Sequence, residues 1–276
     1  MKALGAIGLG ARPVAAELRF RALGGRTFLA RQFTPHPFHI TRPFYHAGDP
    51  QGMATLYLQS SSGGVYSGDD LSLEIGLDAG AQVHVTTQAS TIVHDARGRE
   101  GARQTVCLDV AEGARLDYLP DPAILMTGAN FCNRVTARFG REARVILGDA
   151  QLSHDPEGHA RPFSRLENEV ELISPEGTVL LDRFDLCGSD WPARTGGFAC
   201  SGMMIVVGCA DAGAQMQRAA DTVPGVYAGL SVFSDRDIAL IRFLAPDGAA
   251  LSKVMAALWR AAATVLDGQP PAERRK

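Results

Sequence analysis

The residues best suited to bind a metal lie in one short segment near the middle of the chain. His154, Asp155, Glu157 and His159 place two imidazoles and two carboxylates within six positions. Nickel and zinc both accept such ligands, so the group could form a metal site or the centre of a metal-dependent hydrolase. A polar surface turn is the simpler interpretation of this segment, and it is the one we favour.

A second candidate is a row of polar side chains on one predicted strand. Alternate residues of a strand face opposite sides, so this strand has one polar face and one more apolar face. If the strands stack in layers, the polar row could line an internal channel, because hydroxyl and amide oxygens contact a hydrated divalent ion without holding it tightly. If the row faces solvent, it is only a wet surface. The two faces are His84, Thr86 and Gln88 against Val83, Val85 and Thr87.

The glycine-rich segment 61–70 contains a third candidate, Asp69, directly before a predicted strand. Its glycines favour a turn with positive φ, in which Asp69 is an exposed acid. The sequence lacks a phosphate-binding loop, a nucleophile elbow and a zinc helix of the H-E-x-x-H form. If the process that this protein serves consumes a nucleotide, a partner must therefore supply the binding site.

The composition narrows the class of protein further. Hydrophobic residues make up 46% and charged residues 21% of the 276 residues, which is typical of a folded domain. The formal net charge of -3 gives no basic surface for nucleic acid. The first ten residues are too broken by glycine for a signal peptide, and no apolar run reaches the roughly 18 residues that span a membrane. We expect a cytoplasmic protein with reduced cysteines.

Strands predominate in the first 190 residues, and they recur in a pattern. A strand leads through a Gly-Ala turn, or a variant of it, into a second strand, and the alanines of the three turns lie 33 and 29 residues apart. Such repeats predict strands stacked in layers or in a helical β arrangement, although hairpins of an ordinary sandwich could share the same turns. The three units are 73–75 with 83–85, 108–110 with 116–118, and 135–137 with 145–147.

The last third of the chain predicts two α-helices. Asp211 could cap a short helix that continues to Ala220, and apolar residues from Leu251 to Leu266 recur at helical spacing after a second cap at Asp247. The apolar stripe of this second helix predicts packing against the core. We expect one mainly β domain over residues 12–270, with disordered tails at 1–11 and 271–276.

Five segments, in order and at fitting spacing, resemble the urease accessory protein D family, which is called H in some bacteria. The resemblance extends from about Leu18 to Gly268. It rests on a glycine-rich signature ending at Asp69, a Thr-Thr-Gln segment at 86–91, a Leu-Pro-x-Pro-x-Ile segment at 119–124, an acid at Asp149 and an arginine-containing strand around Arg242.

Several positions depart from the pattern of that family. Ile92 and His94 stand where a lysine and an aromatic residue are usual, and Ser153-His154 replaces a Gly-Arg pair. The usual Pro-Arg-x-Trp ending is absent from 273–276. The chain therefore resembles a divergent member.

The resemblance implies a β-helix-like stack with two helices and no catalytic activity. It also implies binding to apo-urease and to accessory proteins F and G, a possible dimer within that complex, and transient Ni²⁺ with no tightly bound cofactor. Nickel would pass through an internal tunnel; the alternative is an adaptor that only docks its partners. The residues implied as tunnel or interface candidates are Asp69, Thr86, Thr87, Gln88 and Asp149, and the histidines considered as metal ligands are His84, His94, His154 and His159.

Overall fold

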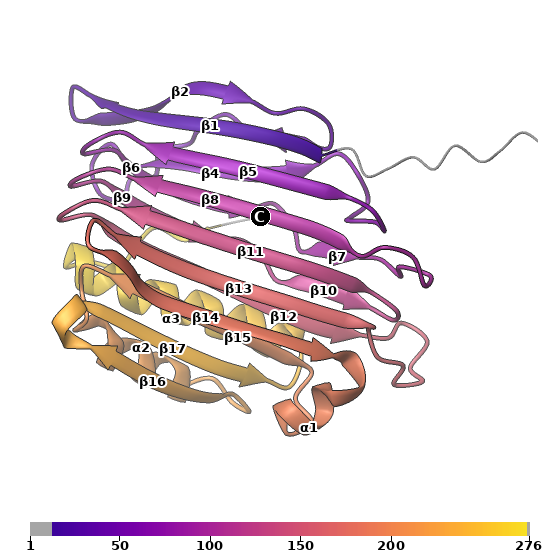
Figure 1. The fold of residues 1–276 in the computed structure, drawn as a ribbon. Coiled ribbons are helices and arrows are strands. Elements are labelled where there is room, and N and C mark those ends of the chain that lie inside the picture. The colour runs from indigo at the N-terminus through magenta and orange to yellow at the C-terminus, as the bar shows by residue number, and fades with distance from the viewer. Residues whose placement is uncertain (1–12, 275–276) are drawn as a thin grey trace, which may run out of the picture.

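The computed structural model describes residues 13–274, and all of the strands in these residues belong to two stacked sheets. Sheet A has seven strands, which Figure 1 shows from the front. In spatial order they are β14 (Gly177–Cys187), β13 (Arg165–Ser174), β11 (Asn130–Phe139), β8 (Ala102–Val110), β5 (Asp70–Leu77), β1 (Pro13–Leu23) and β2 (Arg26–Phe33).

Sheet B lies behind sheet A. Eight of its strands follow one another side by side, and two short strands, β10 and β7, branch off beside β12. In spatial order the eight are β16 (Tyr227–Phe233), β17 (Ile238–Ala245), β15 (Cys200–Val207), β12 (Arg144–His154), β9 (Arg115–Leu119), β6 (Gln82–Thr87), β4 (Ala54–Ser60) and β3 (Phe38–Ile40), while the branch is β10 (Ala123–Met126) and β7 (Thr91–Val93).

The three sequence repeats are the coils of this stack. In each repeat one strand of sheet A turns directly into one strand of sheet B, as β5 does into β6. The strands β5, β8 and β11 then pair in parallel within sheet A, and β6, β9 and β12 pair in parallel within sheet B. The mainly β, β-helix-like prediction is therefore confirmed, because ordinary hairpins would pair the two strands of a repeat with each other.

The turns between the sheets need a left-handed backbone. Gly80 and Gly113 have φ values of 69° and 64°, and Glu142 occupies the equivalent position of the third repeat at 55°. The alanine after each of them is buried, so each turn also closes the core at its end. The Gly-Ala pattern thus has a backbone cause and a packing cause.

We expect Gly113→Ala to lower the free energy of unfolding by about 1–2 kcal/mol, because a Cβ is disfavoured in the left-handed region. No atom lies within 4 Å of the added Cβ, so the cost is backbone strain alone. Thermal unfolding measures the effect, and Glu142→Gly is the matched control, which should leave the stability unchanged or raise it. An unchanged melting temperature for Gly113→Ala would contradict this account of the turns.

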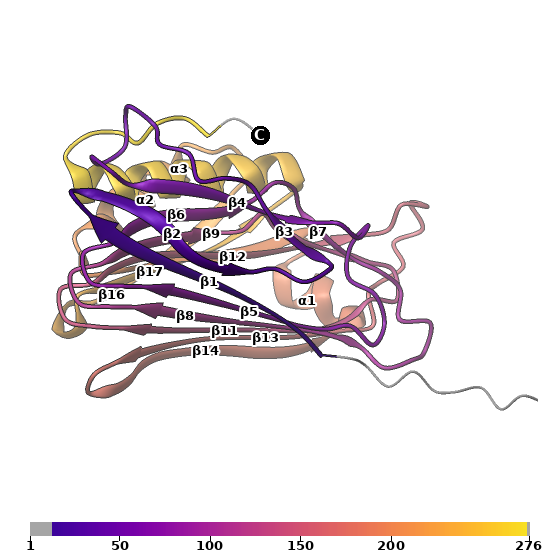
Figure 2. The ribbon, with the colours of Figure 1, turned by 90° about the horizontal axis from the view of Figure 1, so that it is seen from above.

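Helices cover the outer face of sheet B, so the molecule has three layers (Figure 2). The two predicted helices are confirmed as α2 (Ala212–Asp221) and α3 (Gly248–Asp267), and Asp247 caps α3 by accepting a hydrogen bond from the Ala250 N–H. The sequence analysis missed the short α1 (Trp191–Thr195) and the 3-10 turns η1 (Gly188–Asp190) and η2 (Ser234–Arg236). By length and mean hydropathy α3 alone among the described helices could cross a membrane, but here its apolar stripe packs on sheet B.

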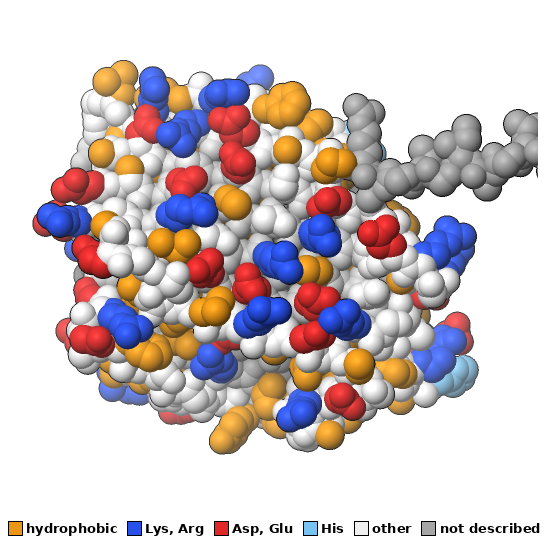
Figure 3. All heavy atoms as spheres, viewed as in Figure 1, with side chains coloured by type: hydrophobic (Ala, Val, Ile, Leu, Met, Phe, Trp, Pro, Cys, Tyr) orange, Lys and Arg blue, Asp and Glu red, His pale blue; other side chains and the backbone are white. Residues whose placement is uncertain are grey.

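None of the helices in residues 13–274 lies on the outer face of sheet A. Arginines and acids are interspersed over it in Figure 3. Many of them pair across neighbouring strands, as Arg165 does with Asp185 at 2.7 Å. This face is a solvated mosaic of charges, and the core lies between the two sheets instead.

Residues 271–274, part of the tail that we expected to be disordered, contact the rest of the fold. Asp49 accepts a hydrogen bond from the Ala272 N–H at 3.0 Å and forms an ion pair with Arg274 at 2.7 Å. Both charged side chains are buried, and the Arg274 guanidinium lies over the Trp259 ring of α3. The tail is thus fastened by contacts with residues far away in sequence. The expected tail at 1–11 lies outside the described residues.

Candidate functional site

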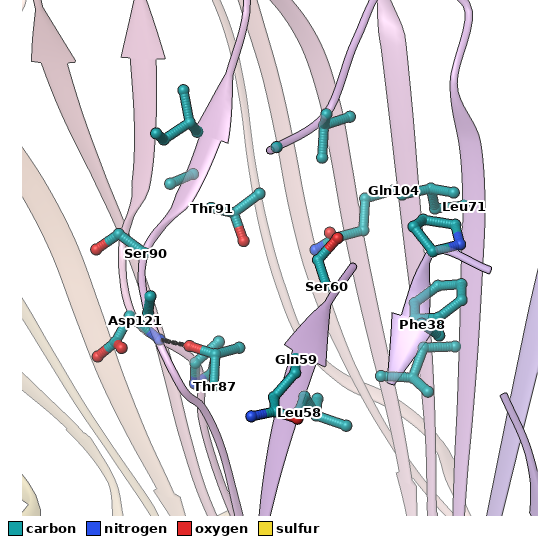
Figure 4. A pocket seen from close by; sticks show the side chains of 18 of the residues that line it. Phe38, Leu58, Gln59, Ser60, Leu71, Thr87, Ser90, Thr91, Gln104 and Asp121 are labelled. Carbon is teal, nitrogen blue, oxygen red and sulfur yellow. Dashed lines mark hydrogen bonds between the residues drawn. The ribbon is translucent and has the colours of Figure 1, made fainter. Parts of the chain in front are cut away.

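An internal cavity of about 600 Å³ lies between the two sheets, at the end where β5, β8 and β11 begin (Figure 4). Strands of sheet A contribute one wall, and the ends of β4 and β6 in sheet B contribute another. Most of the walls are apolar, because these strands turn the same rows inward that form the core. Representative wall residues are Phe38, Leu58, Leu71, Val106 and Phe131.

The inner part of the cavity is polar, and Asp149 of β12 is its charged residue. Asp149 is buried, and both of its carboxylate oxygens accept hydrogen bonds from side-chain amides. Asn133 Nδ2 donates to Oδ1 at 3.3 Å, while Asn168 Nδ2 and Gln151 Nε2 each donate to Oδ2 at 2.7 Å. Asp149 and Gln151 of β12 in sheet B therefore form one hydrogen-bonded cluster with Asn133 of β11 and Asn168 of β13 in sheet A.

Asp149 has a raised pKa and no cationic side chain beside it. Burial raises the pKa of Asp149, and the hydrogen bonds from Asn168 and Gln151 only partly oppose that effect. Tyr118 of β9 also lines the cavity, and its pKa is raised by burial first and then by the charge of Asp149. Within residues 13–274, no cationic side chain lies within 4.0 Å of the Asp149 carboxylate.

The mouth of the cavity is polar as well. Gln88 lies there and accepts a hydrogen bond from Gln59 Nε2 at 2.6 Å, and His39 contacts the same Gln59 side chain at 2.6 Å. Thr87 faces the cavity, and its hydroxyl accepts a hydrogen bond from the Asp121 N–H at 2.7 Å (Figure 4). Of the candidates from sequence, Thr87, Gln88 and Asp149 are therefore brought to one cavity.

Thr86 and His84 lie on the other face of β6, which corrects the predicted polar row. Val83 and Val85 point into the core, so the alternation of the strand directs Thr87 inward and Thr86 outward. Thr86 is buried there and donates to the Leu119 carbonyl at 2.6 Å. This face of β6 is polar but shielded from solvent, because both side chains are buried and Trp259 of α3 lies against the His84 ring.

His84 belongs to a buried charged cluster under α3. Its ring lies 4.8 Å from the Trp259 ring, and its Nδ1 is 3.8 Å from an oxygen of Asp117. Burial lowers the pKa of His84, which therefore favours the neutral imidazole. Arg115 donates to both oxygens of Asp117 and also to Asp267 at the end of α3. This cluster fixes the helix on the sheet.

The remaining candidates have structural partners of their own. Asp69 accepts the Tyr66 N–H at 2.8 Å and so closes the glycine-rich turn instead of lining the cavity. His94 stacks on the Tyr66 ring with centroids 4.3 Å apart, and its Nε2 lies 3.0 Å from the Gly63 carbonyl oxygen. Both residues therefore belong to a surface turn beside β7.

The segment from His154 to His159 is a polar surface turn, as the simpler interpretation had it. Asp155 accepts backbone N–H groups from Glu157, His159 and Arg161 at 2.9–3.1 Å. These bonds, that of Arg161 above all, lower the pKa of Asp155. No group of three or more His, Cys, Asp or Glu side chains in the described part of the chain is placed to hold a metal ion. The four histidines considered as ligands therefore form no common site.

Asn133, Asn168 and Gln151 were missed in the sequence analysis, although a signal existed. Asn133 interrupts the inward row that contains Phe131 and Val135, and Asn168 interrupts the equivalent row of β13. A lone amide in a buried row needs a hydrogen-bonding partner. Such interruptions on neighbouring strands point to one shared cluster.

Comparison with known proteins gives consistent matches along nearly the whole chain. The model of the family described as UreD urease accessory protein matches residues 13–276. A "Urease accessory protein UreD 1" of Methylorubrum populi is 42% identical over 96% of this chain and 92% of its own length. Proteins of the same name are 35% identical in a Bradyrhizobium species, over 96% and 95%, and 34% identical in Pseudomonas syringae, over 93% of both chains.

Proposed function

This chain belongs to the UreD urease accessory protein family, and on that premise we propose that it is a non-catalytic scaffold for nickel insertion into urease. In this proposal it acts in the cytoplasm, binds apo-urease, and assembles with accessory proteins F and G. Nickel is its cargo, held transiently, and the chain keeps no cofactor of its own.

The observation that carries the proposal is the unpaired charge of Asp149. A buried carboxylate without a cationic partner is costly, so a protein retains one where the charge has a use. Asp149 lies at the inner part of a cavity whose mouth is lined by amide and hydroxyl groups. We propose that Ni²⁺ enters at Gln88 and Thr87 and reaches Asp149.

The ligands along this route suit a cargo better than a resident ion. Oxygen ligands from amides, hydroxyls and isolated carboxylates bind divalent nickel more weakly than clustered imidazoles or thiolates would. Two acids line the cavity, Asp149 at its inner part and Asp121 beside Thr87, and the cysteines do not line it. A route with these groups lowers the cost of desolvating the ion and still lets it leave.

A second candidate function is a docking adaptor through which no nickel passes. One observation favours it: beyond Asp149 the space between the sheets is filled by the apolar core, including Val135, Leu147 and Leu172. In this arrangement the cavity does not continue through that core as an open passage. The adaptor would bind the same partners, but the cavity would be irrelevant to activation.

Blocking the mouth distinguishes the two functions. We expect Thr87→Trp to reduce urease activation at limiting nickel about tenfold or more, which corresponds to a barrier of only about 1.4 kcal/mol. Gln82→Trp is the matched control, because it adds the same side chain at the opposite end of β6, outside the cavity. Activation is measured with purified apo-urease and accessory proteins, and co-purification reports the assembly. Normal activation by an assembled Thr87→Trp variant would favour the adaptor.

A further inference from the structure

The buried acids of this protein fall into two kinds. Asp117 is paired with Arg115, and Asp49 is paired with Arg274, so each of these carboxylates has a guanidinium beside it. Asp149 is also buried, yet its hydrogen-bonding partners are the amides of Asn133, Asn168 and Gln151. The chain therefore pairs buried acids with arginine where they hold the fold together, and uses amides at the cavity.

Side-chain amides differ from arginine because they can both donate and accept hydrogen bonds. A guanidinium can only donate hydrogen bonds, whereas an amide donates through nitrogen and accepts through oxygen. In the arrangement seen here the N–H groups point at Asp149, and they would repel a cation from its oxygens. If the amides turned by half a rotation, their carbonyl oxygens would face the same place and would add ligands to a cation.

The amides are also linked to one another. Gln104 Nε2 donates to Asn133 Oδ1 at 3.3 Å, and Asn133 Nδ2 donates to Asn168 Oδ1 at 2.8 Å. Turning Asn168 reverses the bond that it shares with Asn133, and turning Asn133 reverses the bond with Gln104. The amides of Gln104, Asn133 and Asn168 can therefore reverse together, since each bond between two amides keeps a donor and an acceptor. At Asp149 the reversal removes the donor and leaves oxygens facing oxygens, an arrangement that a bound cation would hold together.

We propose that Asn133, Asn168 and Gln151 form an amide gate, which closes Asp149 by N–H donation and admits a divalent cation by presenting carbonyl oxygens. This inference rests on the proposed function, and it names the residues that set the affinity of the Asp149 site for the cation. With one carboxylate and neutral oxygens the site binds the cation weakly, because affinity at oxygen sites rises with the number of charged ligands. The amides thus allow the bound cation to leave the site again.

Direct binding of Ni²⁺ to the purified chain tests the gate. Asn168→Asp and Gln151→Glu each replace a rotating amide by a fixed acceptor of nearly the same size, and we expect each to lower the Kd for Ni²⁺ at least tenfold. Equilibrium dialysis measures the Kd. Transfer of bound Ni²⁺ to a chelator measures the release rate, which we expect to be slower for both variants. The control is Asn130→Asp, which adds the same charge on β11 at a residue that, unlike Asn168 and Gln151, makes no hydrogen bond to Asp149, and it should leave the Kd unchanged.

The outcomes separate this inference from the function on which it rests. Tighter binding by either folded variant, without tightening in the control, supports the gate. If both variants fold and bind Ni²⁺ no more tightly than the wild-type chain, the gate is wrong, even where removal of the Asp149 charge impairs activation. If tightening occurs in all three variants alike, the effect is one of general charge, and the gate is equally wrong.

Discussion

Replacing Arg115 with alanine is expected to lower the free energy of unfolding by about 3–5 kcal/mol, the usual cost of removing one partner from a buried ion pair. The Arg115 side chain is 6% exposed and touches two acids, Asp117 and Asp267, which are 1% and 10% exposed. Without the guanidinium, both carboxylates remain under α3 with no cation. Chemical denaturation of the wild-type chain and the variant measures the difference.

The pH dependence of that difference follows from Asp117. Burial by itself would raise the pKa of Asp117, but the charge of Arg115 and its two hydrogen bonds to the carboxylate bring the pKa below its usual range. A lowered pKa means that the stabilisation is present above the pKa of the unfolded chain, roughly 4, and is lost as the pH falls below it. The gap between wild type and variant should therefore be full at neutral pH and shrink in acid.

Arg144→Ala is the matched control for Arg115. Arg144 is the register partner of Arg115 on the neighbouring strand β12, at the same end of the stack, but its side chain is exposed and its hydrogen bond to α3, to the Leu266 carbonyl, is long at 3.4 Å. We expect its removal to change the stability by no more than about 0.5 kcal/mol. Equal losses in the two variants would show that the buried cluster does not fasten α3.

The stack itself could be predicted from the sequence because its causes are local. Alternation of apolar residues gave the strands, and the left-handed turns at Gly80 and Gly113 gave the step from one sheet to the other. The ends of α3 were readable for the same reason, since Asp247 caps its start and Gly268 has a φ of 71° at its end. Each of these features depends on residues within one turn of the chain.

The faces of β6 could not be assigned from alternation alone. The pattern correctly separates His84 and Thr86 from Val83 and Val85, but it does not say what covers each side. The cover of the polar face is α3, whose Trp259 donates to Asp117 at 3.0 Å across 142 positions of sequence. A partner so distant leaves no local signal, and so a polar face was taken for a wet one.

The hydrogen-bonded surroundings of Asp149 could not be predicted from the sequence either. Asp149 became a candidate through the family resemblance, because one acid in a strand gives no signal by itself. Its hydrogen bonds come from residues such as Asn133 and Asn168, which lie 16 and 19 positions away in sequence and meet it between the sheets. Only the parallel stacking of successive coils brings such residues together.

Asp149→Asn is expected to reduce urease activation at limiting nickel by about tenfold or more, while the variant remains folded. The substitution keeps the volume and removes the one negative charge of the cavity lining that is held solely by amides. A cation that reaches this point then loses its charged ligand and must shed water with only neutral oxygens in reach, which raises the barrier to its passage. Purified apo-urease, the accessory proteins and a limiting nickel supply make the measurement direct.

The stability of the same variant provides an internal check. The pKa of Asp149 is raised in the folded chain. The acid therefore costs no stability below the pKa of the unfolded chain, and the cost grows as the pH rises from that value to the folded pKa and stays constant above it. Asparagine carries no such cost, so the variant should melt no lower than the wild-type chain at neutral pH. A loss of activation together with unchanged or higher stability cannot then be attributed to unfolding.

Two controls complete the experiment. Asp69→Asn removes an acid of the glycine-rich turn, and Thr86→Val removes a hydroxyl from the face of β6 that α3 covers. Because neither side chain lines the cavity, both variants should activate urease as the wild-type chain does. If Asp149→Asn assembles with its partners and also activates normally, nickel does not pass Asp149. If the controls fail as badly as Asp149→Asn, the cavity has no special part in the transfer.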